Sequence, residues 1–284
     1  AVGPDVTYVR ARVTEAAEQW TGPGGADVGE VVILAKDLMK EVLRHNVEII
    51  EEFTGSELVG RSYEPLFPGA VPRNGSKTAW TVLEADWVTT TDGTGVVHTA
   101  VMYGEDDYNL GMAAGLPAYH TVGMDGAFIE GTHAQLDGHY VKDCDQTIIE
   151  LLSAEGGSNQ KGPASGLLYR EKAYLHDYPH CWRTGHPLLY YAMDSWFVRM
   201  TAVKDRLLEF NDGVEWAPDW VGEGRFGEWL RNVKDWAISR ERYWGTPLPV
   251  WRSESGQMKC IGSIEELQKE VAKANAAGFD NPPC

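Results

Sequence analysis

A chain of 284 residues with 43% hydrophobic residues can bury a substantial core, which excludes an intrinsically disordered protein. Its net charge of −17 excludes a protein that mainly wraps nucleic-acid backbone, so any contact with nucleic acid must be local. The four cysteines are scattered, which excludes a disulfide scaffold. No apolar run has the length of a membrane span or the pattern of a secretory leader, and we therefore predict a cytoplasmic protein.

The first half of the chain is predicted to consist of short strands with one helix. Residues 6–13 and the apolar run 31–35 have the patterns of strands. Apolar residues on one face predict a helix over 36–46, and strand alternation returns over 47–53. Three more predicted strands, each bounded by turn residues, cover 79–83, 86–90 and 95–99. Together these elements predict a mainly β, α+β body with peripheral helices.

The second half differs in composition. A helix is predicted over 144–155, followed by the polar, glycine-rich loop 156–163, where nothing favours packing. Most of the 11 Trp residues lie after position 180. A helical stripe in this part consists of Phe226, Trp229, Leu230, Val233, Trp236 and Ala237. We therefore expect two domains, 1–166 and 167–284, the second an aromatic-rich α/β unit.

A glycine turn, a histidine and an acidic cluster lie close together in residues 93–108. The glycines on either side of Thr94 permit a sharp turn, and His98 ends a short apolar run beside a polar loop, where sites often lie. One interpretation is a pocket whose carboxylate holds a substrate ammonium. The alternative is a hydrogen-bonded core histidine, with residues 105–107 forming an acidic turn or helix start.

Two other segments carry residues with chemical potential. His180, Cys181 and Cys260 could suggest zinc, but their spacing fits no common zinc pattern, so packing is favoured and no metal is expected. Residues 235–251 predict a helix ending at Arg240 and Arg242, with cations at its negative end and prolines fixing an extended exit. These arginines also offer a phosphate or nucleotide contact, although no glycine-rich phosphate loop accompanies them.

Long stretches of the chain resemble one known family. Residues 235–251 are similar to the Asp-Trp-x-Ile-Ser-Arg-x-Arg-Tyr-Trp-Gly-x-Pro-x-Pro segment of class I isoleucyl-tRNA synthetases, and residues 176–183 and 195–197 match the same family. Residues 93–107 resemble the Gly-Thr-Gly-Ile/Val-Val-His…Gly-x-x-Asp segment of its editing domain. Residues 260–263 further resemble the branch shared by eukaryotic cytosolic enzymes and some bacteria.

The resemblance implies a β-barrel-like editing domain followed by a return segment toward the catalytic core. The implied activity is proofreading: hydrolysis of valine wrongly joined to tRNA(Ile), or of valyl-adenylate, within an isoleucine-tRNA ligase. Editing would need no cofactor, whereas the parent enzyme would use ATP and Mg. The implied partners are the tRNA(Ile) 3′ end carrying valine and the rest of the parent synthetase, in a monomer away from membranes.

The resemblance also implies roles for individual residues. Asp107 matches the carboxylate that anchors the α-ammonium of the misattached amino acid, and His98 matches the histidine that refuses isoleucine. These two would form the catalytic pair, acting by orientation and electrostatics. The substrate-binding residues around them would be Asp106, Thr94, Gly95, Val97 and Thr99.

Several departures from the family pattern leave alternatives open. The family's Trp-Thr-Thr-Thr-Pro-Trp run is expected just upstream of Ala1, and the His-x-Gly-His and Lys-Met-Ser-Lys-Ser signatures of ATP binding are absent, so this chain alone should not activate isoleucine. Val101 replaces the usual proline, and Thr184 stands where zinc-binding relatives have cysteine. The alternatives are a valyl or leucyl editing domain, or a catalytically silent tRNA-docking fragment.

Overall fold

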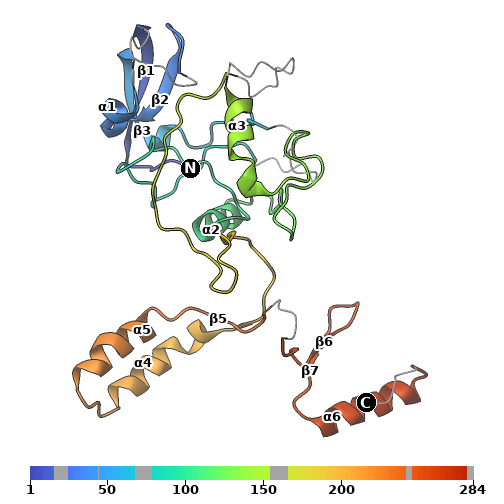
Figure 1. The fold of residues 1–284 in the computed structure, drawn as a ribbon. Helices are drawn as coiled ribbons and strands as arrows, with labels where there is room; N and C mark the ends of the chain where they lie inside the picture. Colours follow the sequence, from blue (N-terminus) through green and yellow to red (C-terminus); the bar gives the residue numbers. More distant parts are fainter. Residues whose placement is uncertain (16–24, 44, 68–78, 154–165, 241–244, 280–284) are drawn as a thin grey trace. The chain divides into compact units, whose positions relative to one another are not determined.

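The structure is a computed structural model that describes residues 1–15, 25–43, 45–67, 79–153, 166–240 and 245–279 (Figure 1). The chain forms two compact units, Ala1–Ala192 and Met193–Cys284. The sequence placed the boundary at 166/167, next to the predicted loop 156–163, which lies outside the described residues. Leu168 donates its amide to the Leu152 carbonyl and Ala192 donates to Met102, so the stretch between them belongs to the first unit.

The first unit contains a three-stranded antiparallel sheet in the order β2-β1-β3. Its strands are β1 (Thr7–Glu15), β2 (Val31–Ala35) and β3 (Asn46–Thr54), which confirm the three strands predicted at 6–13, 31–35 and 47–53. The central strand β1 is the most deeply buried, and a register shift falls between Arg10 and Ala11 where it pairs with β3. On the exposed side the sheet carries ion pairs such as Arg10–Glu51 at 2.9 Å, which contribute little to stability.

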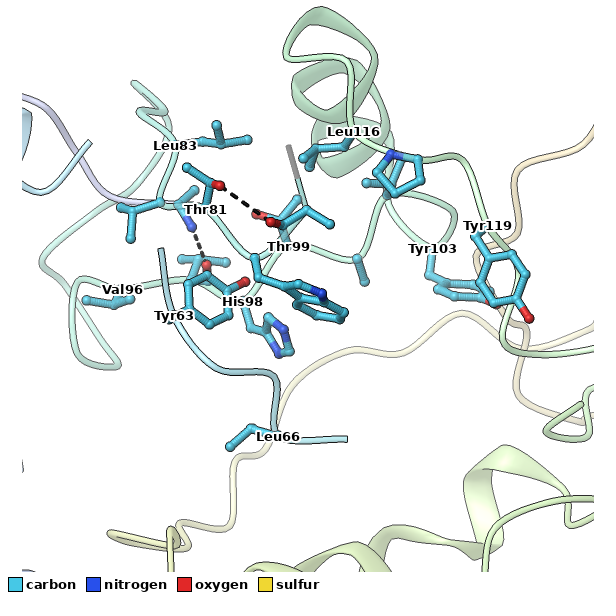
Figure 2. A pocket seen from close by; sticks show the side chains of 18 of the residues that line it. Tyr63, Leu66, Thr81, Leu83, Val96, His98, Thr99, Tyr103, Leu116 and Tyr119 are labelled. Carbon is cyan, nitrogen blue, oxygen red and sulfur yellow. Dashed lines mark hydrogen bonds between the residues drawn. The ribbon is translucent and has the colours of Figure 1, made fainter. Parts of the chain in front are cut away.

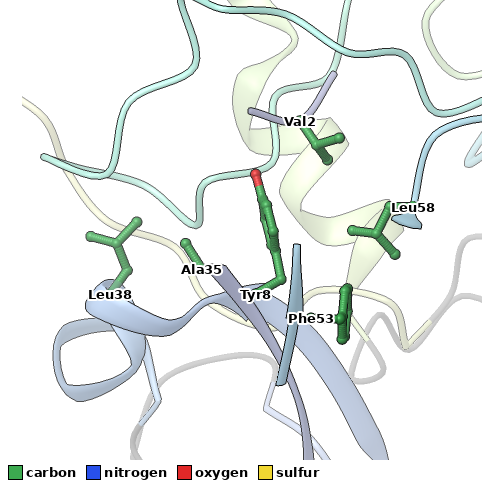
Figure 3. Packing of buried hydrophobic residues seen from close by; sticks show 6 residues of the cluster. All are labelled: Val2, Tyr8, Ala35, Leu38, Phe53 and Leu58. Carbon is green, nitrogen blue, oxygen red and sulfur yellow. The ribbon is translucent and has the colours of Figure 1, made fainter. Parts of the chain in front are cut away.

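The core of the first unit packs against one end of this sheet (Figure 3). It consists of Val2, Tyr8, Ala35, Leu38, Phe53 and Leu58. The Tyr8 and Phe53 rings stack with centroids 6.4 Å apart. The Tyr8 hydroxyl donates to the Gly95 carbonyl and accepts from the Gly3 amide at 3.1 Å. This buried phenol therefore joins the sheet to the glycine turn of the predicted site.

The helix predicted over 36–46 is much shorter in the structure. It consists of the 3-10 turn η1 (Lys36–Leu38) and the single turn α1 (Met39–Val42). Leu43 is extended, with φ −78° and ψ 125°, and Asn46 already pairs with Glu15 in the sheet. The pairing of β3 thus overrides the helical pattern in its last residues.

The strands predicted at 79–83, 86–90 and 95–99 do not form continuous strands, and the described residues contain no closed barrel. Isolated bridges replace them: Val2 pairs with Glu84 and with Val96, and Ser62 pairs with Thr81. Positive φ angles at Gly93 and Gly95 break the extended backbone. The α+β class is confirmed, with small open antiparallel sheets in place of the expected barrel.

The remaining elements of the first unit are short helices: η2 (Gly55–Glu57), α2 (Glu105–Ala113), η4 (Val141–Asp143) and α3 (Asp145–Leu152). Thr54 and Glu57 form a capping box at η2. The helix predicted over 144–155 corresponds to α3, which ends where the Ser153 hydroxyl donates to the Ile149 carbonyl. The last two residues predicted for this helix, and the glycine-rich loop after it, lie outside the described residues.

The described part of the second unit contains two short two-stranded ribbons, three α-helices, one 3-10 turn and one π-type turn. Its elements are β4 (Phe197–Val198), η5 (Met200–Val203), α4 (Lys204–Asp212), the π-type turn η6 (Gly222–Phe226), α5 (Gly227–Arg231), β5 (Trp236–Ala237), β6 (Val250–Arg252), β7 (Met258–Cys260) and α6 (Ile264–Ala276). Strand β4 pairs with β5 and β6 with β7, both antiparallel. The Ser263 side chain caps α6 by accepting from the Glu266 amide. None of the helices among the described residues is both long and apolar enough to cross a bilayer.

The helical stripe predicted through Ala237 is wrong beyond α5. Trp236 and Ala237 form β5, and the Asp235 carboxylate accepts from the amide and hydroxyl of Thr201, which draws the chain away from the helix axis. Arg240 is therefore not at a helix end, and Arg242 lies outside the described residues. The spacing of three and four residues is compatible with a helix, but the pairing of Trp236 and Ala237 with β4 decides their conformation.

We predict that the Tyr8 hydroxyl contributes measurably to the free energy of unfolding. Tyr8→Phe leaves the Gly3 amide and the Gly95 carbonyl without their partner in a buried place, so the free energy of unfolding should fall by about 1–3 kcal/mol. Urea denaturation of the 284-residue chain measures it. Tyr190→Phe is the matched control, because that side chain is 64% exposed. Equal stability of the two variants would contradict the assigned role.

Candidate functional site

A pocket of about 640 Å³ opens in the first unit (Figure 2). Its walls come from four stretches of chain, residues 63–66, 79–83, 94–103 and 116–121, together with Ala1. Of the residues predicted to form the site, those that line the pocket are Thr94, Val97, His98 and Thr99. The pocket is mostly apolar, with a few polar groups on one side, which is the usual character of a small-molecule site.

The glycine turn holds this wall against the sheet. Gly95 has a φ of +74° and is buried, and a Cβ at this position would lie 2.5 Å from the Ala35 Cβ. The Ala35 amide donates to the Thr94 carbonyl at 2.9 Å, and the Thr94 hydroxyl bonds the Val96 backbone. Gly95 was predicted to bind substrate, but it does not line the pocket; its place against Ala35 positions the residues that do.

His98 projects into the pocket from this wall (Figure 2). The ring is solvent-accessible, yet the pocket walls surround it, and this partial burial lowers its pKa while the nearby Asp107 charge acts in the opposite direction. A lowered pKa keeps the imidazole neutral at physiological pH. His98 is thus a pocket residue, in agreement with the first of the two interpretations of this stretch.

Asp107 lies in the first turn of α2, whose N-cap is Gly104. Its carboxylate is partly buried, and Oδ1 has no hydrogen-bond partner within the described part of the chain. Burial raises the pKa of Asp107 and the Asp106 charge adds to the rise, while the hydrogen bond from the Ala100 amide, the N-terminal ammonium and His98 oppose it. A buried carboxylate oxygen without a partner calls for a ligand or another explanation.

Asp107 and Asp106 are placed differently from the pocket residues. Neither lines the pocket, and Asp106 is exposed on the helix surface. Asp107 is nevertheless adjacent to the pocket, because it interacts with Ala100 and His98, both of which line it. The acidic cluster does form a helix start, as the second interpretation expected, but one of its carboxylates faces inward rather than toward water.

An aromatic wall of the pocket was not predicted from the sequence. Tyr63 and Trp80 meet edge to face with centroids 6.3 Å apart, and Tyr103 and Tyr119 line the pocket further on (Figure 2). Trp80 has a φ of +61°, a conformation that bulky residues rarely adopt and that often marks a functional site. Trp80 lies in a segment predicted as a strand, but no sequence pattern marks these rings as pocket residues.

Tyr103 also fixes the far side of the pocket. Its hydroxyl accepts from the backbone amides of Thr121 at 2.7 Å and Val122 at 2.9 Å. The Tyr191 hydroxyl donates to the Val122 carbonyl, and the Tyr191 ring stacks on His120 with centroids 4.1 Å apart. The far side of the pocket is therefore supported by Tyr191, which lies near the end of the first unit.

The two other segments singled out in the sequence form local structure. His180 bonds the Tyr178 carbonyl through Nδ1, and the Cys181 amide donates to His186. Among the described residues, no group of three or more His, Cys, Asp or Glu side chains is arranged to hold a metal ion. Arg240 donates to the carbonyls of Ala237 and Ser239, contacts within its own turn.

Comparisons with known proteins give a consistent result. Residues 26–281 match the family described as tRNA synthetases class I (I, L, M and V). The isoleucine–tRNA ligase of Clostridium novyi (strain NT) is 49% identical over 242 residues, 85% of this chain and 22% of that protein. That of Bacillus thuringiensis (strain Al Hakam) is 43% identical over 274 residues, 96% of this chain and 24% of that protein. The chain thus spans less than a quarter of these curated relatives.

Burial of Asp107 predicts a pH-dependent cost in stability. Because its pKa is raised above the ordinary value of 3.8, the folded chain holds this proton more tightly than the unfolded chain, and that stabilising contribution is lost as pH rises through the folded pKa. Asp107→Asn should therefore unfold at a higher temperature than Asp145→Asn at about pH 7, with the gap closing toward about pH 4.

Asp145→Asn is the matched control for this comparison, because it removes an exposed carboxylate from the first turn of another helix, α3. Thermal unfolding of both variants across this pH range gives the measurement. A gap that is absent at neutral pH, or that grows as pH falls, would show that Asp107 carries no burial cost.

Proposed function

The chain belongs to the class I tRNA synthetases of the isoleucine, leucine, methionine and valine group, and from this premise we propose that it is the proofreading region of an isoleucine-tRNA ligase. The proposed reaction is hydrolysis of valine misattached to tRNA(Ile), or of valyl-adenylate. Residues 1–166 would form the editing domain and residues 167–284 the return segment toward the catalytic core. The isoleucine–tRNA ligases among the similar proteins support the amino-acid assignment.

The observation that carries this proposal is an inward-facing carboxylate beside a histidine-lined pocket. Asp107 keeps one oxygen without a partner and interacts with Ala100 and His98 of the pocket wall. A carboxylate in a partly dry place forms a strong charge-assisted hydrogen bond with an ammonium group. A misattached amino acid retains a free α-ammonium, so this arrangement fits its recognition.

The need for a second site follows from the size of the discrimination problem. A pocket that separates side chains differing by one methylene gains only about 1–3 kcal/mol, and isoleucine against valine is the standard case from which this range is known. A second, smaller site that hydrolyses the valyl product supplies the missing accuracy. His98, exposed on the pocket wall, is the side chain we assign to exclude isoleucine.

The chemistry would be attack of water on the ester that links valine to the terminal adenosine. Asp107 orients the substrate through its ammonium, so positioning supplies most of the rate. The Thr99 hydroxyl lines the pocket and is buried without a partner among the described residues, which makes it available to a substrate oxygen. A volume of about 640 Å³ exceeds the needs of a valyl group, leaving the aromatic wall for the adenosine.

The wider setting is proposed on the same basis. The parent enzyme would bind ATP and Mg for amino-acid activation, and the partners of this chain would be the tRNA(Ile) 3′ end and the rest of the synthetase. We propose a cytoplasmic monomer. The relatives reported above are bacterial, and the eukaryotic-like branch suggested by residues 260–263 stays a prediction.

A catalytically silent docking fragment is the second candidate, because Asp107 does not itself line the pocket. A valyl or leucyl editing domain is the third and differs only in the side chain that it refuses. Release of valine, threonine and methionine from the corresponding charged tRNAs separates these candidates. No release of any of them, with the upstream threonine-rich segment restored, would favour the silent fragment.

Loss of the Asp107 carboxylate should abolish recognition of the ammonium. Asp107→Ala is expected to weaken binding of a non-hydrolysable valyl-adenosine analogue by about tenfold to 100-fold, the range for a hydrogen bond to a charged group. Calorimetry measures the affinity, and Asp145→Ala is the control because its carboxylate is exposed in the first turn of α3, outside the pocket. Unchanged affinity in Asp107→Ala would overturn the proposed function.

Removal of the His98 ring should enlarge the pocket on the side that excludes isoleucine. His98→Ala is expected to raise the rate of isoleucine release from Ile-tRNA(Ile) by about tenfold or more, the scale of a one-methylene discrimination. Deacylation of labelled Ile-tRNA(Ile) provides the measurement, with His186→Ala as the control at an exposed position outside the pocket. If isoleucine release stays negligible in His98→Ala, another residue excludes isoleucine.

A further inference from the structure

Gly104, the N-cap of α2, has no backbone need to be glycine. Its φ of −161° and ψ of 145° are extended values that any residue adopts. Ser, Thr, Asp and Asn are preferred at this position because their side chains bond the free amides of the first turn. Here no side-chain cap is present, so glycine forgoes a stabilising interaction that the position would accept.

The space that a side chain would occupy at this position is filled by Asp107. A Cβ on Gly104 would lie 2.4 Å from Asp107 Oδ2 and 3.3 Å from its Cγ. These distances are well inside van der Waals contact, so any other residue at 104 must displace the carboxylate. The two ends of the same helical turn are thus fitted to each other.

A second glycine on α2 holds the helix against the pocket wall. Gly111 is buried, and a Cβ there would lie 2.6 Å and 2.8 Å from the two methyl groups of Val101. Val101 follows Ala100, whose amide faces the Asp107 carboxylate, and both line the pocket. Close packing of Gly111 on Val101 therefore sets the distance between the wall and the start of α2.

We propose that Gly104 is a positioning residue. Because it has no side chain, it leaves open the space beside it, here called the carboxylate seat, in which the Asp107 carboxylate lies with Oδ1 free for the substrate ammonium. The inference rests on the proposed function. Gly104 acts only through Asp107, since it does not line the pocket. Oδ2 packs on Gly104 while Oδ1 has no partner among the described residues, so the seat decides which oxygen is left for a ligand.

A purely structural role for Gly104 makes the opposite prediction for one substitution. Gly104→Ser introduces a preferred N-cap residue, which should preserve or raise the stability of the helix. The same substitution places an atom in the carboxylate seat. Loss of ligand binding without loss of stability is therefore the signature of positioning.

The test uses four variants: Gly104→Ala, Gly104→Ser, Asp107→Ala and the double variant Gly104→Ala with Asp107→Ala. Affinity for the non-hydrolysable valyl-adenosine analogue is measured by calorimetry on the 284-residue chain, and the unfolding temperature of each variant is recorded. The matched control is Gly262→Ala, a glycine just before α6 where a Cβ would meet nothing closer than Glu266 Oε2 at 3.7 Å.

Both Gly104 variants should bind at least about tenfold more weakly, the loss expected when a charge-assisted hydrogen bond is misplaced. Their unfolding temperatures should stay close to wild type, and Gly262→Ala should bind normally. In the Asp107→Ala background, Gly104→Ala should cause no further loss, because the two residues act as one unit.

The failures of the two proposals are distinguishable. If Asp107→Ala weakens binding while both Gly104 variants retain it, the positioning role is overturned and the proposed function stands. Losses that add in the double variant, or that follow the unfolding temperature, also overturn the positioning role. If the wild-type chain does not bind the analogue, the proposed function fails and the positioning role fails with it.

Discussion

The contact between the sheet and the glycine turn is the constraint on which the rest of the candidate site depends. The buried phenol of Tyr8, a residue of β1, donates to the Gly95 carbonyl, and Gly95 lies directly against Ala35 at the end of β2. Only a residue without a side chain permits this approach. Because the backbone of residue 95 is fixed in this way, the side chains that follow it, His98 among them, emerge toward the pocket rather than into the core.

A second constraint is electrostatic, and it lowers the stability of the fold where the first constraint raises it. The Asp107 carboxylate is held in a partly buried place where ionisation is disfavoured, and the Asp106 charge beside it adds to this effect. The N-terminal ammonium of Ala1 opposes it, but no cationic side chain among the described residues forms an ion pair with Asp107. A fold selected only for stability would expose or pair such a group. Carboxylates kept in costly surroundings are typical of binding and catalytic sites, where the ligand supplies the missing charge.

The sequence was sufficient where local pattern and tertiary pairing agree. Local patterns predicted the three strands that form the sheet, and the resemblance drew attention to His98 and Asp107. It failed where distant partners decide: Val2 bridges two segments more than 80 residues away, which no local pattern reveals, and Trp236 follows a helical spacing but pairs with β4. The close approach of Gly104 to the Asp107 carboxylate could not be predicted either, because it depends on where a side-chain oxygen lies in three dimensions and not on composition.

The isolated bridges around Val2 have a consequence for how the molecule opens. The sheet holds itself together through continuous ladders, whereas the pocket walls are joined to it and to one another by single pairings such as Val2 with Val96. Segments with few cooperative hydrogen bonds open at lower free energy than the elements that support them. We therefore expect the pocket walls to open at a lower free energy than the sheet, and a molecule that fills the pocket to slow the hydrogen exchange of their amides while that of β1 changes little.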